Sequence, residues 1–344
     1  MFSFIKAFVI SGIVLFLVSP VSCRLSEKGI TLYCVEDYEC PKIKAFGVTG
    51  AETASITFSK EVNLHNCSVS PGVLVVSSEL SCALEDEKLW VYDISFDRKC
   101  TAGTDYKFIG IVKDSLGNSL TFSLPFKGFN ENVPDLEITE IHPKYSAAKR
   151  KTGTVYKTEY VELLVKSDGN LAGVELRSAN DGMDKVYKFP AVEVRRGEIV
   201  LVHLRTKTEV AVSELGNELN LSTEYYSSDN ARDLWAENDS ARLGDDIDVI
   251  CLVNSFTEEI IDGICYAKSD FTEWKDDFMA EMAKKLKELD LWNAETVSES
   301  ICIDGITSSK SIIKTGIGKT AADWTVSESG RETPGKIDFQ IIME

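Results

Sequence analysis

Short apolar runs alternate with turn sequences along the stretch 156–204. In the run 160–165 (YVELLV), successive side chains lie on opposite faces of an extended chain, as in a β-strand. The sequences DGN at 168–170 and NDG at 180–182 favour turns. A continuous apolar run, 199–202 (IVLV), then predicts a central strand that is buried on both faces. The stretch therefore predicts an antiparallel β-sheet.

The region before this stretch has the same pattern of strands and turns, without helical periodicity. We predict a small all-β domain over 23–135 and a second β domain over 136–344, in tandem. Gly128 and the asparagines within 126–132 mark a linker between them. The strands expected in the first domain are 54–59, 73–76, 88–94, 106–112 and 119–124.

One segment of the second domain has helical periodicity instead. Asp270 and Glu273 have the spacing of a capping box, which predicts an inserted amphipathic helix over about 270–292. Its polar face is not strongly basic, so packing on the sheet is favoured over binding to a membrane surface. The apolar residues that repeat every three or four positions are Trp274, Phe278, Met282, Leu286 and Leu289.

Composition and charge exclude one class of partner. The chain has 344 residues, of which 44% are hydrophobic, as expected for a folded protein with room for two domains. Its formal net charge is −18. An acidic surface repels phosphate, whereas nucleic-acid-binding proteins present a basic face. We therefore expect no nucleic acid as a partner.

The N-terminus has the features of an export signal. A lysine precedes the apolar stretch 7–18, which is too short to span a bilayer but has the length of a signal-peptide hydrophobic region. The sequence VSC at 21–23 resembles a bacterial lipobox of the relaxed spirochaete type, with Pro20 where the motif usually has leucine. The resemblance implies lipidation of Cys23 after removal of residues 1–22, and hence a membrane anchor. An ordinary secretory signal cut near Cys23 is the alternative. Both interpretations export the protein, so we expect an envelope or extracellular protein.

The nine cysteines fit an oxidising compartment. A bond between Cys34 and Cys40 would close a short loop, and Cys251 and Cys265 flank a predicted hairpin, so these are possible disulfides. Connectivity does not follow from the spacing. No Cys-x-x-Cys pair and no histidine in ligand spacing supports a metal site, so we expect neither a metal nor a cofactor.

Two sequence motifs of the first domain, SITFSKEV at 55–62 and GTDYKFIGIVKDSLGNSL at 103–120, resemble bacterial Ig-like domains of the SbsA type. The resemblance implies a β-sandwich that holds another module away from a surface. The aspartate, glycine and asparagine at 114–118 supply too few oxygens for calcium, so a turn is favoured there.

The second domain resembles a lamin-tail domain over about 138–338. The similar motifs are ITEIHP at 138–143, EYVEL at 159–163, DWT at 323–325 and TPG at 333–335. The resemblance implies an Ig-like β-sandwich of the kind found in nuclear lamins and as an accessory module of exported bacterial proteins. The expected fold class is therefore all-β, with two Ig-like antiparallel β-sandwich domains in tandem.

Two regions of the second domain are candidates for ligand binding. A loop with Lys144, Lys149, Arg150 and Lys151 is the only basic cluster, and it can either grip a phosphate or acidic glycan or simply be solvated. The long connection 205–246 carries aromatic residues that either bind a ligand or fold back over a sheet edge. These aromatic residues are Tyr225, Tyr226 and Trp235.

Three further sequence features imitate a catalytic, cation-binding or phosphate-binding site. Glu159 and Glu162 suggest the paired acids of a glycosidase, but residues three apart on a strand point to opposite faces, so a structural role is favoured. The aspartates at 245, 246 and 248 suggest a weak cation site, although an acidic turn is favoured. The sequence KTGIGKT at 314–320 imitates a phosphate-binding loop but lacks the first glycine of that motif.

The sequence contains no motif for nucleophilic or metal-dependent catalysis, and its three histidines are scattered. We therefore expect a non-enzymatic cell-envelope lipoprotein in which an Ig-like spacer presents a lamin-tail module for binding protein or polysaccharide. One alternative is an exported phosphodiesterase or glycosidase with a lamin-tail accessory domain. Another is a structural periplasmic protein.

Overall fold

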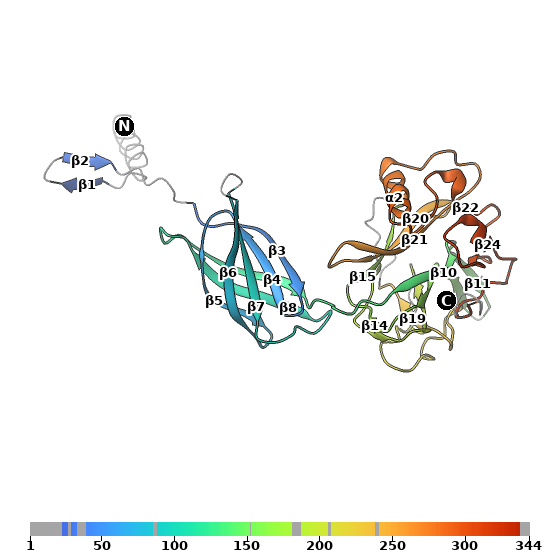
Figure 1. Cartoon of the computed structure of the whole chain (residues 1–344). Helices are drawn as coiled ribbons and strands as arrows, with labels where there is room; N and C mark the ends of the chain where they lie inside the picture. Colours follow the sequence, from blue (N-terminus) through green and yellow to red (C-terminus); the bar gives the residue numbers. More distant parts are fainter. Residues whose placement is uncertain are drawn as a thin grey trace, which may run out of the picture.

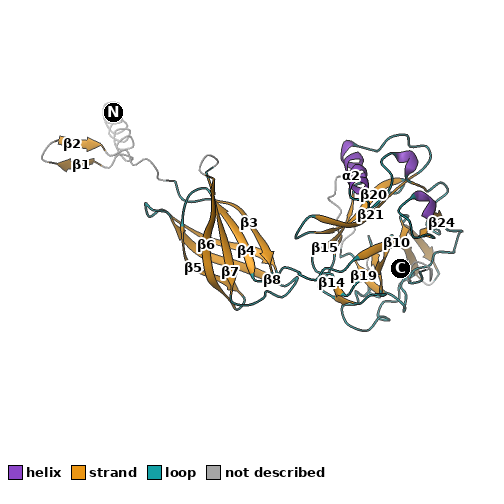
Figure 2. Cartoon of the chain, viewed as in Figure 1, coloured by secondary structure: helices purple, strands orange, loops and turns teal. Residues whose placement is uncertain are grey.

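The computed structural model describes residues 23–26, 29–32, 39–84, 88–151, 153–180, 187–205, 208–237 and 241–337. Their regular secondary structure is almost entirely β-sheet, which confirms the predicted all-β fold (Figures 1 and 2). The predicted signal segment, 1–22, lies outside them. Among the described residues, no helix is both long and apolar enough to cross a membrane.

The first domain is one antiparallel sheet of seven strands in the order β3-β4-β7-β6-β5-β8-β9. The end strands β3 and β9 approach each other, so the sheet curves around a single core. Phe58, Ile94 and Phe108 are completely buried in it. The strands are β3 (Ile43–Gly50), β4 (Thr53–Phe58), β5 (Asn63–Ser70), β6 (Val73–Leu84), β7 (Leu89–Phe96), β8 (Asp105–Lys113) and β9 (Ser119–Lys127), and a separate hairpin comprises β1 (Cys23–Ser26) and β2 (Gly29–Leu32).

The second domain packs a six-stranded sheet against a five-stranded one. The first has the order β19-β18-β13-β10-β23-β24, and the second has the order β16-β15-β20-β21-β22. Most pairs are antiparallel, but β19 joins β18 and β22 joins β21 in parallel. The strands are β10 (Leu136–His142), β13 (Tyr160–Val165), β18 (Ile199–His203), β19 (Arg232–Trp235), β23 (Ile312–Lys314) and β24 (Trp324–Val326), then β15 (Val174–Ser178), β16 (Tyr187–Lys188), β20 (Ile247–Asn254), β21 (Glu259–Ala267) and β22 (Ile301–Cys302), with small pairs β11 (Ser146–Arg150) and β12 (Gly153–Lys157), and β14 (Gly169–Asn170) and β17 (Glu193–Val194).

The six-stranded sheet is buried on both faces. Val161 and Val202 belong to the core between the two sheets, whereas Tyr160 and Leu201 belong to a smaller cluster on the opposite face. This confirms the prediction that the run 199–202 is a central strand buried on both sides. The outer face is covered by the connection between β18 and β19 and by the chain after β24.

The helix is shorter than predicted. Helix α2 (Asp277–Glu288) begins after Asp276, whose carboxylate accepts the backbone N–H of Met279, so the predicted cap at Asp270 is wrong. Its buried residues are Met279, Ala283 and Leu286, so Leu286 is the one predicted residue that is fully buried. Trp274 and Met282 of the predicted face are partly buried against the core, whereas Phe278 and Leu289 are exposed. The helix packs on β20 and β21 (Figure 1), which confirms that it covers the sheet.

The predicted linker makes specific contacts with the second domain. The Nδ2 of Asn130 donates to the backbone oxygens of Asn170 at 2.6 Å and of Ala172 at 2.9 Å. A β-carbon added at Gly103, in the turn before β8, would lie 2.8 Å from the side chain of Ala191. Both the residues after β9 and the turn before β8 therefore fit closely against the second domain.

Candidate functional site

The outer face of the six-stranded sheet holds a buried pair of carboxylates. A β-bulge at Thr139 places two residues of β10 opposite one residue of β13, and it brings Glu140 directly opposite Glu162. Both side chains are 1% exposed. The Thr139 hydroxyl donates to Oε1 of Glu162 at 2.7 Å. The bulge thus gathers two acids in a dry environment.

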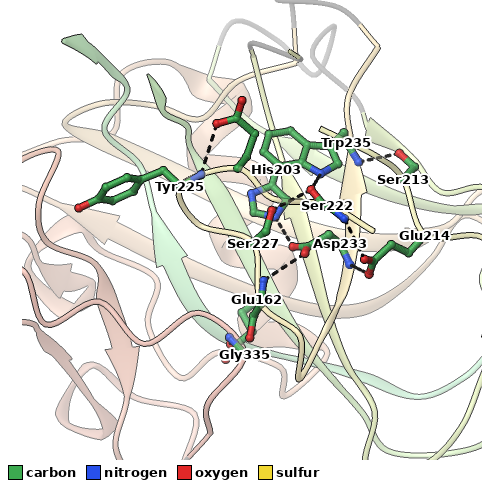
Figure 3. A network of polar contacts seen from close by, with 12 residues as sticks. Glu162, His203, Ser213, Glu214, Ser222, Tyr225, Ser227, Asp233, Trp235 and Gly335 are labelled. Atoms are coloured by element: carbon green, nitrogen blue, oxygen red, sulfur yellow. Dashed lines mark hydrogen bonds and ion pairs between the residues drawn. The ribbon is translucent and has the colours of Figure 1, made fainter. Parts of the chain in front are cut away.

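Both carboxylates bind the C-terminal segment 332–335, which we call the strap. The Thr333 hydroxyl and backbone N–H donate to Glu140 at 2.6 and 3.1 Å. The Gly335 N–H donates to Glu162 at 2.7 Å (Figure 3), and Tyr160 donates to Glu140 at 2.5 Å. The acids therefore hold the strap against the sheet, although it is distant in sequence.

Burial, followed by the neighbouring Glu140, raises the pKa of Glu162 to about 8. The sequence motif suggested a different pair, Glu159 and Glu162. Glu159 instead forms an ion pair with Arg205, at 3.2 Å from Nε to Oε2. The two predicted acids therefore have different partners, in agreement with the argument from strand spacing. The true neighbour, Glu140, was missed because the bulge that aligns it has no sequence signature.

Tyr226 belongs to the same buried layer. Its hydroxyl lies 3.2 Å from Nε2 of His142 and donates to Glu332 of the strap at 2.8 Å. Nδ1 of His142 lies 3.0 Å from the backbone oxygen of Thr158. Burial lowers the pKa of His142 to about 4, so the ring is neutral at physiological pH. Tyr226 is 3% exposed, so its predicted role as an exposed ligand contact is wrong.

Trp235 is also buried, so its predicted role as a ligand contact is wrong as well. It lies in β19 and stacks on His203 with 4.0 Å between ring centres (Figure 3). Its indole N–H donates to the Ser222 hydroxyl at 3.0 Å. The connection 205–246 thus folds back and extends the sheet, which was the alternative interpretation of its aromatic residues.

His203 and Asp233 form a buried pair, with 2.6 Å between Nε2 and Oδ1. Both are fully buried, and within the described part of the chain Nδ1 of His203 has no hydrogen-bond partner. The nearby Ser222 hydroxyl is shared between Trp235 and Ser227 instead (Figure 3). A serine nucleophile must be activated by the histidine and be reachable by substrate. His203, Asp233 and the nearby Ser222 are therefore the residue types of a catalytic triad, but they do not have its geometry.

The predicted basic loop is a projecting hairpin formed by β11 and β12. Lys149, Arg150 and Lys151 are exposed at its tip, and none forms an ion pair with a residue that the structure describes. Lys144 lies apart at the base, where its ammonium binds Asp246 at 2.8 Å. Three of the four predicted cations therefore remain together at the surface, and the fourth stabilises the fold.

Tyr225 is the one predicted aromatic contact that is exposed, with 54% of its surface accessible. Its ring points away from His203 and Trp235 (Figure 3). Nζ of Lys157, at the base of the hairpin, lies 4.9 Å from the centre of the ring. Tyr225 therefore adds an aromatic face beside the basic hairpin.

A family model named TP_1001_2nd, described as "protein second domain", matches residues 134–326. The match covers more than half of the chain. The chain belongs to this family. The matched region includes Glu140, Glu162 and His203, whereas the strap at 332–335 lies beyond it.

An uncharacterized protein of Treponema pallidum (strain Nichols) is 32% identical over 155 residues, which are 45% of this chain and 37% of that protein. The chain thus spans little more than a third of the length of this relative. Among solved structures, the N-terminal part of the bacterial S-layer protein SbsC is 14% identical with a TM-score of 0.25, over 67% of this chain and 45% of that one. A DUF4876 family protein from Bacteroides thetaiotaomicron is 10% identical with a TM-score of 0.29, over 83% and 97% of the two chains.

The family match also includes the glycine-containing loop 314–320. The carboxylate of Asp323 accepts hydrogen bonds from the backbone N–H groups of Gly318 at 3.1 Å and Thr320 at 3.2 Å, and from the Thr320 hydroxyl at 2.6 Å. An internal carboxylate therefore occupies the donors that a phosphate would need. This geometry agrees with the view that the loop is not a nucleotide site.

The remaining candidates from the sequence are a cation site at the acidic turn 245–248 and disulfides between the cysteines. No group of three metal-ligating side chains occurs among the described residues. Cys251 and Cys265 are free buried thiols, since Cys251 lies opposite Gly263 and Cys265 opposite Val249 in the register of β20 and β21. The predicted disulfide between them is therefore absent from the structure. Cys40 is a free exposed thiol, and Cys34 lies outside the described residues.

Proposed function

We propose that this protein is an exported, non-enzymatic binding protein of the bacterial cell envelope, anchored by a lipid at Cys23. In this proposal the first domain is an SbsA-type spacer and the second is a lamin-tail-like module that binds protein or polysaccharide. The lipobox-like sequence at 21–23 supports the export and the anchor. The relative in Treponema pallidum adds support, because spirochaetes have the relaxed lipoboxes that this sequence resembles.

The observation that carries the binding role is the exposed basic hairpin. Lys149, Arg150 and Lys151 lie together at the tip of the hairpin in a chain of net charge −18, and the exposed ring of Tyr225 lies at its base, beside Lys157. Electrostatic attraction between such a local cluster and an anionic partner is short-ranged at physiological salt, with a Debye length of about 8 Å. A projecting tip keeps the cations away from the remaining acidic surface. The hairpin therefore suits an acidic glycan or an acidic protein segment.

The buried acids favour binding over hydrolysis. A glycosidase needs two carboxylates that flank a substrate bond and are open to water. Glu140 and Glu162 are enclosed and hold the strap, and Glu159 is enclosed beside Arg205. These roles support a structural explanation for all three acids.

The anchor is tested by replacing Cys23 with alanine in cells that express the full chain. We expect the wild-type protein in the membrane fraction, with an acylated N-terminal Cys23 in the mass spectrum, and the variant in the soluble exported fraction. Recovery of the wild-type protein in the cytoplasm, or unchanged membrane association of the variant, would contradict the anchor.

The hairpin is tested with a triple variant, Lys149→Gln/Arg150→Gln/Lys151→Gln. Exposed ion pairs contribute about 0.2–1 kcal/mol each, so we expect about tenfold weaker binding to immobilised polygalacturonate at low salt. The matched control removes three exposed lysines of the first domain, Lys44, Lys107 and Lys113. Equal losses in both variants would show that net charge, and not the hairpin, determines binding.

A further inference from the structure

One edge of the first domain is open. Strand β6 pairs with β7 from Val75 to Leu84, but it pairs with β5 only at Val73 and Leu74. Among the residues that the structure describes, no other strand pairs with that side of 75–84. A row of backbone N–H and C=O groups therefore faces outward there, and such a row is a template for a further strand.

The other edge strands of the large sheets are short or protected. In the first domain, β3 carries Lys44 and β9 carries Pro125, and these two strands approach each other. In the second domain, the edge strands β16, β19, β22 and β24 have at most four residues each. Charged side chains, proline and short length are the usual means by which proteins prevent edge-to-edge pairing. Strand β6 has 12 residues, and its segment 75–84 contains no lysine, arginine or proline.

The open edge also exposes apolar side chains. Leu80 lies directly opposite Tyr92, which is buried in the core, so Leu80 is on the core side of the sheet. Leu80 is nevertheless 44% exposed, and Val76 is 62% exposed. The core of the first domain is therefore incompletely covered beside β6, and a strand added to this edge would cover both residues.

We propose that this edge pairs with the same edge of a second copy of the protein, which joins the two sheets into one across a two-fold axis. A two-fold interface is self-complementary, because the same surface of each copy forms both of its sides. The added strand must supply a free backbone edge and an apolar side chain beside Leu80, and β6 of the second copy supplies both. This inference concerns the first domain and does not depend on the ligand proposed for the second.

The sequence of β6 favours one register for this pairing. The pairing of β6 with β7 is irregular on both sides of the segment 77–80, so the axis is expected within that segment. Ser78 is the one position in it at which an axis places Val76 of each copy opposite Leu80 of the other. An axis at Glu79 would place two carboxylates directly opposite each other, which is destabilising. We therefore expect Ser78 to lie opposite its counterpart.

The acidic charge of the chain does not prevent this contact. Of the net charge of −18, residues 23–135 contribute only −5, from 11 basic and 16 acidic residues. Glu79 is the only charged residue of 75–84, and in this register it lies opposite Ser77 of the other copy. Exposed charges separated by more than about 8 Å are largely screened at physiological salt. The two edges therefore meet without like charges directly opposite each other.

The test is sedimentation velocity of residues 23–344 with Cys23→Ala, a chain that cannot be lipidated and so needs no detergent. We expect a reversible equilibrium that shifts from monomer to dimer as the protein concentration rises. Leu80→Lys places a charge at the edge of both copies and should weaken dimerisation at least tenfold. Leu116→Lys is the matched control, because Leu116 is 61% exposed in the turn between β8 and β9, and it should leave the dimer unchanged.

A cysteine on the axis tests the register. The background is Cys40→Ser/Cys82→Ser/Cys302→Ser, which removes the exposed thiols of the described chain. Adding Ser78→Cys should give a disulfide-linked dimer on mild oxidation, because the two sulfur atoms meet at the axis. Adding Ser81→Cys instead should not, because in this register its two copies lie six residues apart, about 20 Å along the strands.

A protein that stays monomeric at every concentration would overturn the proposal. A dimer that Leu80→Lys leaves unchanged would also overturn it, since the interface would lie elsewhere, and so would equal losses in Leu80→Lys and Leu116→Lys, which would show an effect of net charge. Equal cross-linking through Ser78→Cys and Ser81→Cys would show random collision and would contradict the paired edge. If circular dichroism shows that Leu80→Lys is unfolded, Val76→Lys at the more exposed position of the same edge takes its place.

Discussion

Replacing Glu162 with glutamine is expected to halve the fall in the free energy of unfolding that this protein shows between pH 6.5 and 8. The pKa of Glu162 is about 8 in the folded protein and that of Glu159 is also about 8, against an ordinary value of 4.5. A raised folded-state pKa means that the folded protein retains a proton that the unfolded chain has lost. The free energy of unfolding therefore falls as the pH rises from about 4.5 to about 8.

The window above pH 6.5 isolates this effect. The titration of His142 changes the free energy of unfolding in the opposite direction, because its pKa of about 4 lies below its ordinary 6.5. The stability that His142 contributes is therefore complete above pH 6.5 and is lost only on acidification. One pH unit corresponds to 1.36 kcal/mol per group, so each glutamate contributes about 2 kcal/mol to the decline between pH 6.5 and 8. Urea unfolding of the wild type at these two pH values measures the sum.

Glutamine fits the site of Glu162 in one orientation. Its carbonyl oxygen can accept the Gly335 N–H, and its amide can donate to the Thr139 hydroxyl, which now donates to Glu162. Glu159→Gln is the matched variant, since Glu159 lies beside Arg205 and away from the strap. Each variant should halve the pH dependence and the double variant should abolish most of it. A decline that persists in the double variant would show that other groups cause it.

The sheet of the second domain could be predicted from sequence because its strands follow simple periodicity. The run 199–202 is apolar at every position and lies buried on both faces. The run 160–165 alternates, but Tyr160 and Glu162 on its second face are also buried, which the alternation alone does not reveal. The covering elements come from elsewhere in the chain. Local patterns therefore predicted the strands but not what lies over them.

The candidate sites show the same limit. A basic hairpin tip is local in sequence, and Lys149, Arg150 and Lys151 are exposed as their composition suggested. Tyr226 and Trp235 were candidates for ligand binding because they lie in a long polar connection, and the alternative was that they fold back over a sheet edge. The parallel strand β19 takes that connection back into the sheet, as the alternative expected. The Glu140 and Glu162 pair depends on the register between two strands. Register and parallel pairing are tertiary properties, which explains why these residues were misassigned or missed.

Replacing Leu286 with alanine is expected to destabilise the second domain by about 2–5 kcal/mol, the usual cost of truncating a buried leucine. Leu286 is completely buried on the inner face of α2. It packs closely on β21, since a β-carbon added at Gly263 would lie 2.5 Å from its Cδ2. Leu289 follows one turn later and is 48% exposed, so Leu289→Ala is a matched control with an expected change of about 0.5 kcal/mol or less. Urea unfolding followed by tryptophan fluorescence measures both.

A second substitution distinguishes packing from helix propensity. Gly263→Ala alone should be destabilising, because its methyl group would overlap Leu286. Combined with Leu286→Ala, the same methyl group enters the space that the leucine side chain has left, although the backbone oxygen of Ile250 at 2.9 Å limits the fit. We therefore expect the double variant to lose less stability than the sum of the two single losses. Additive losses would mean that α2 does not dock through this contact, whereas a favourable coupling would show that Leu286 and Gly263 together set how closely the helix approaches the sheet.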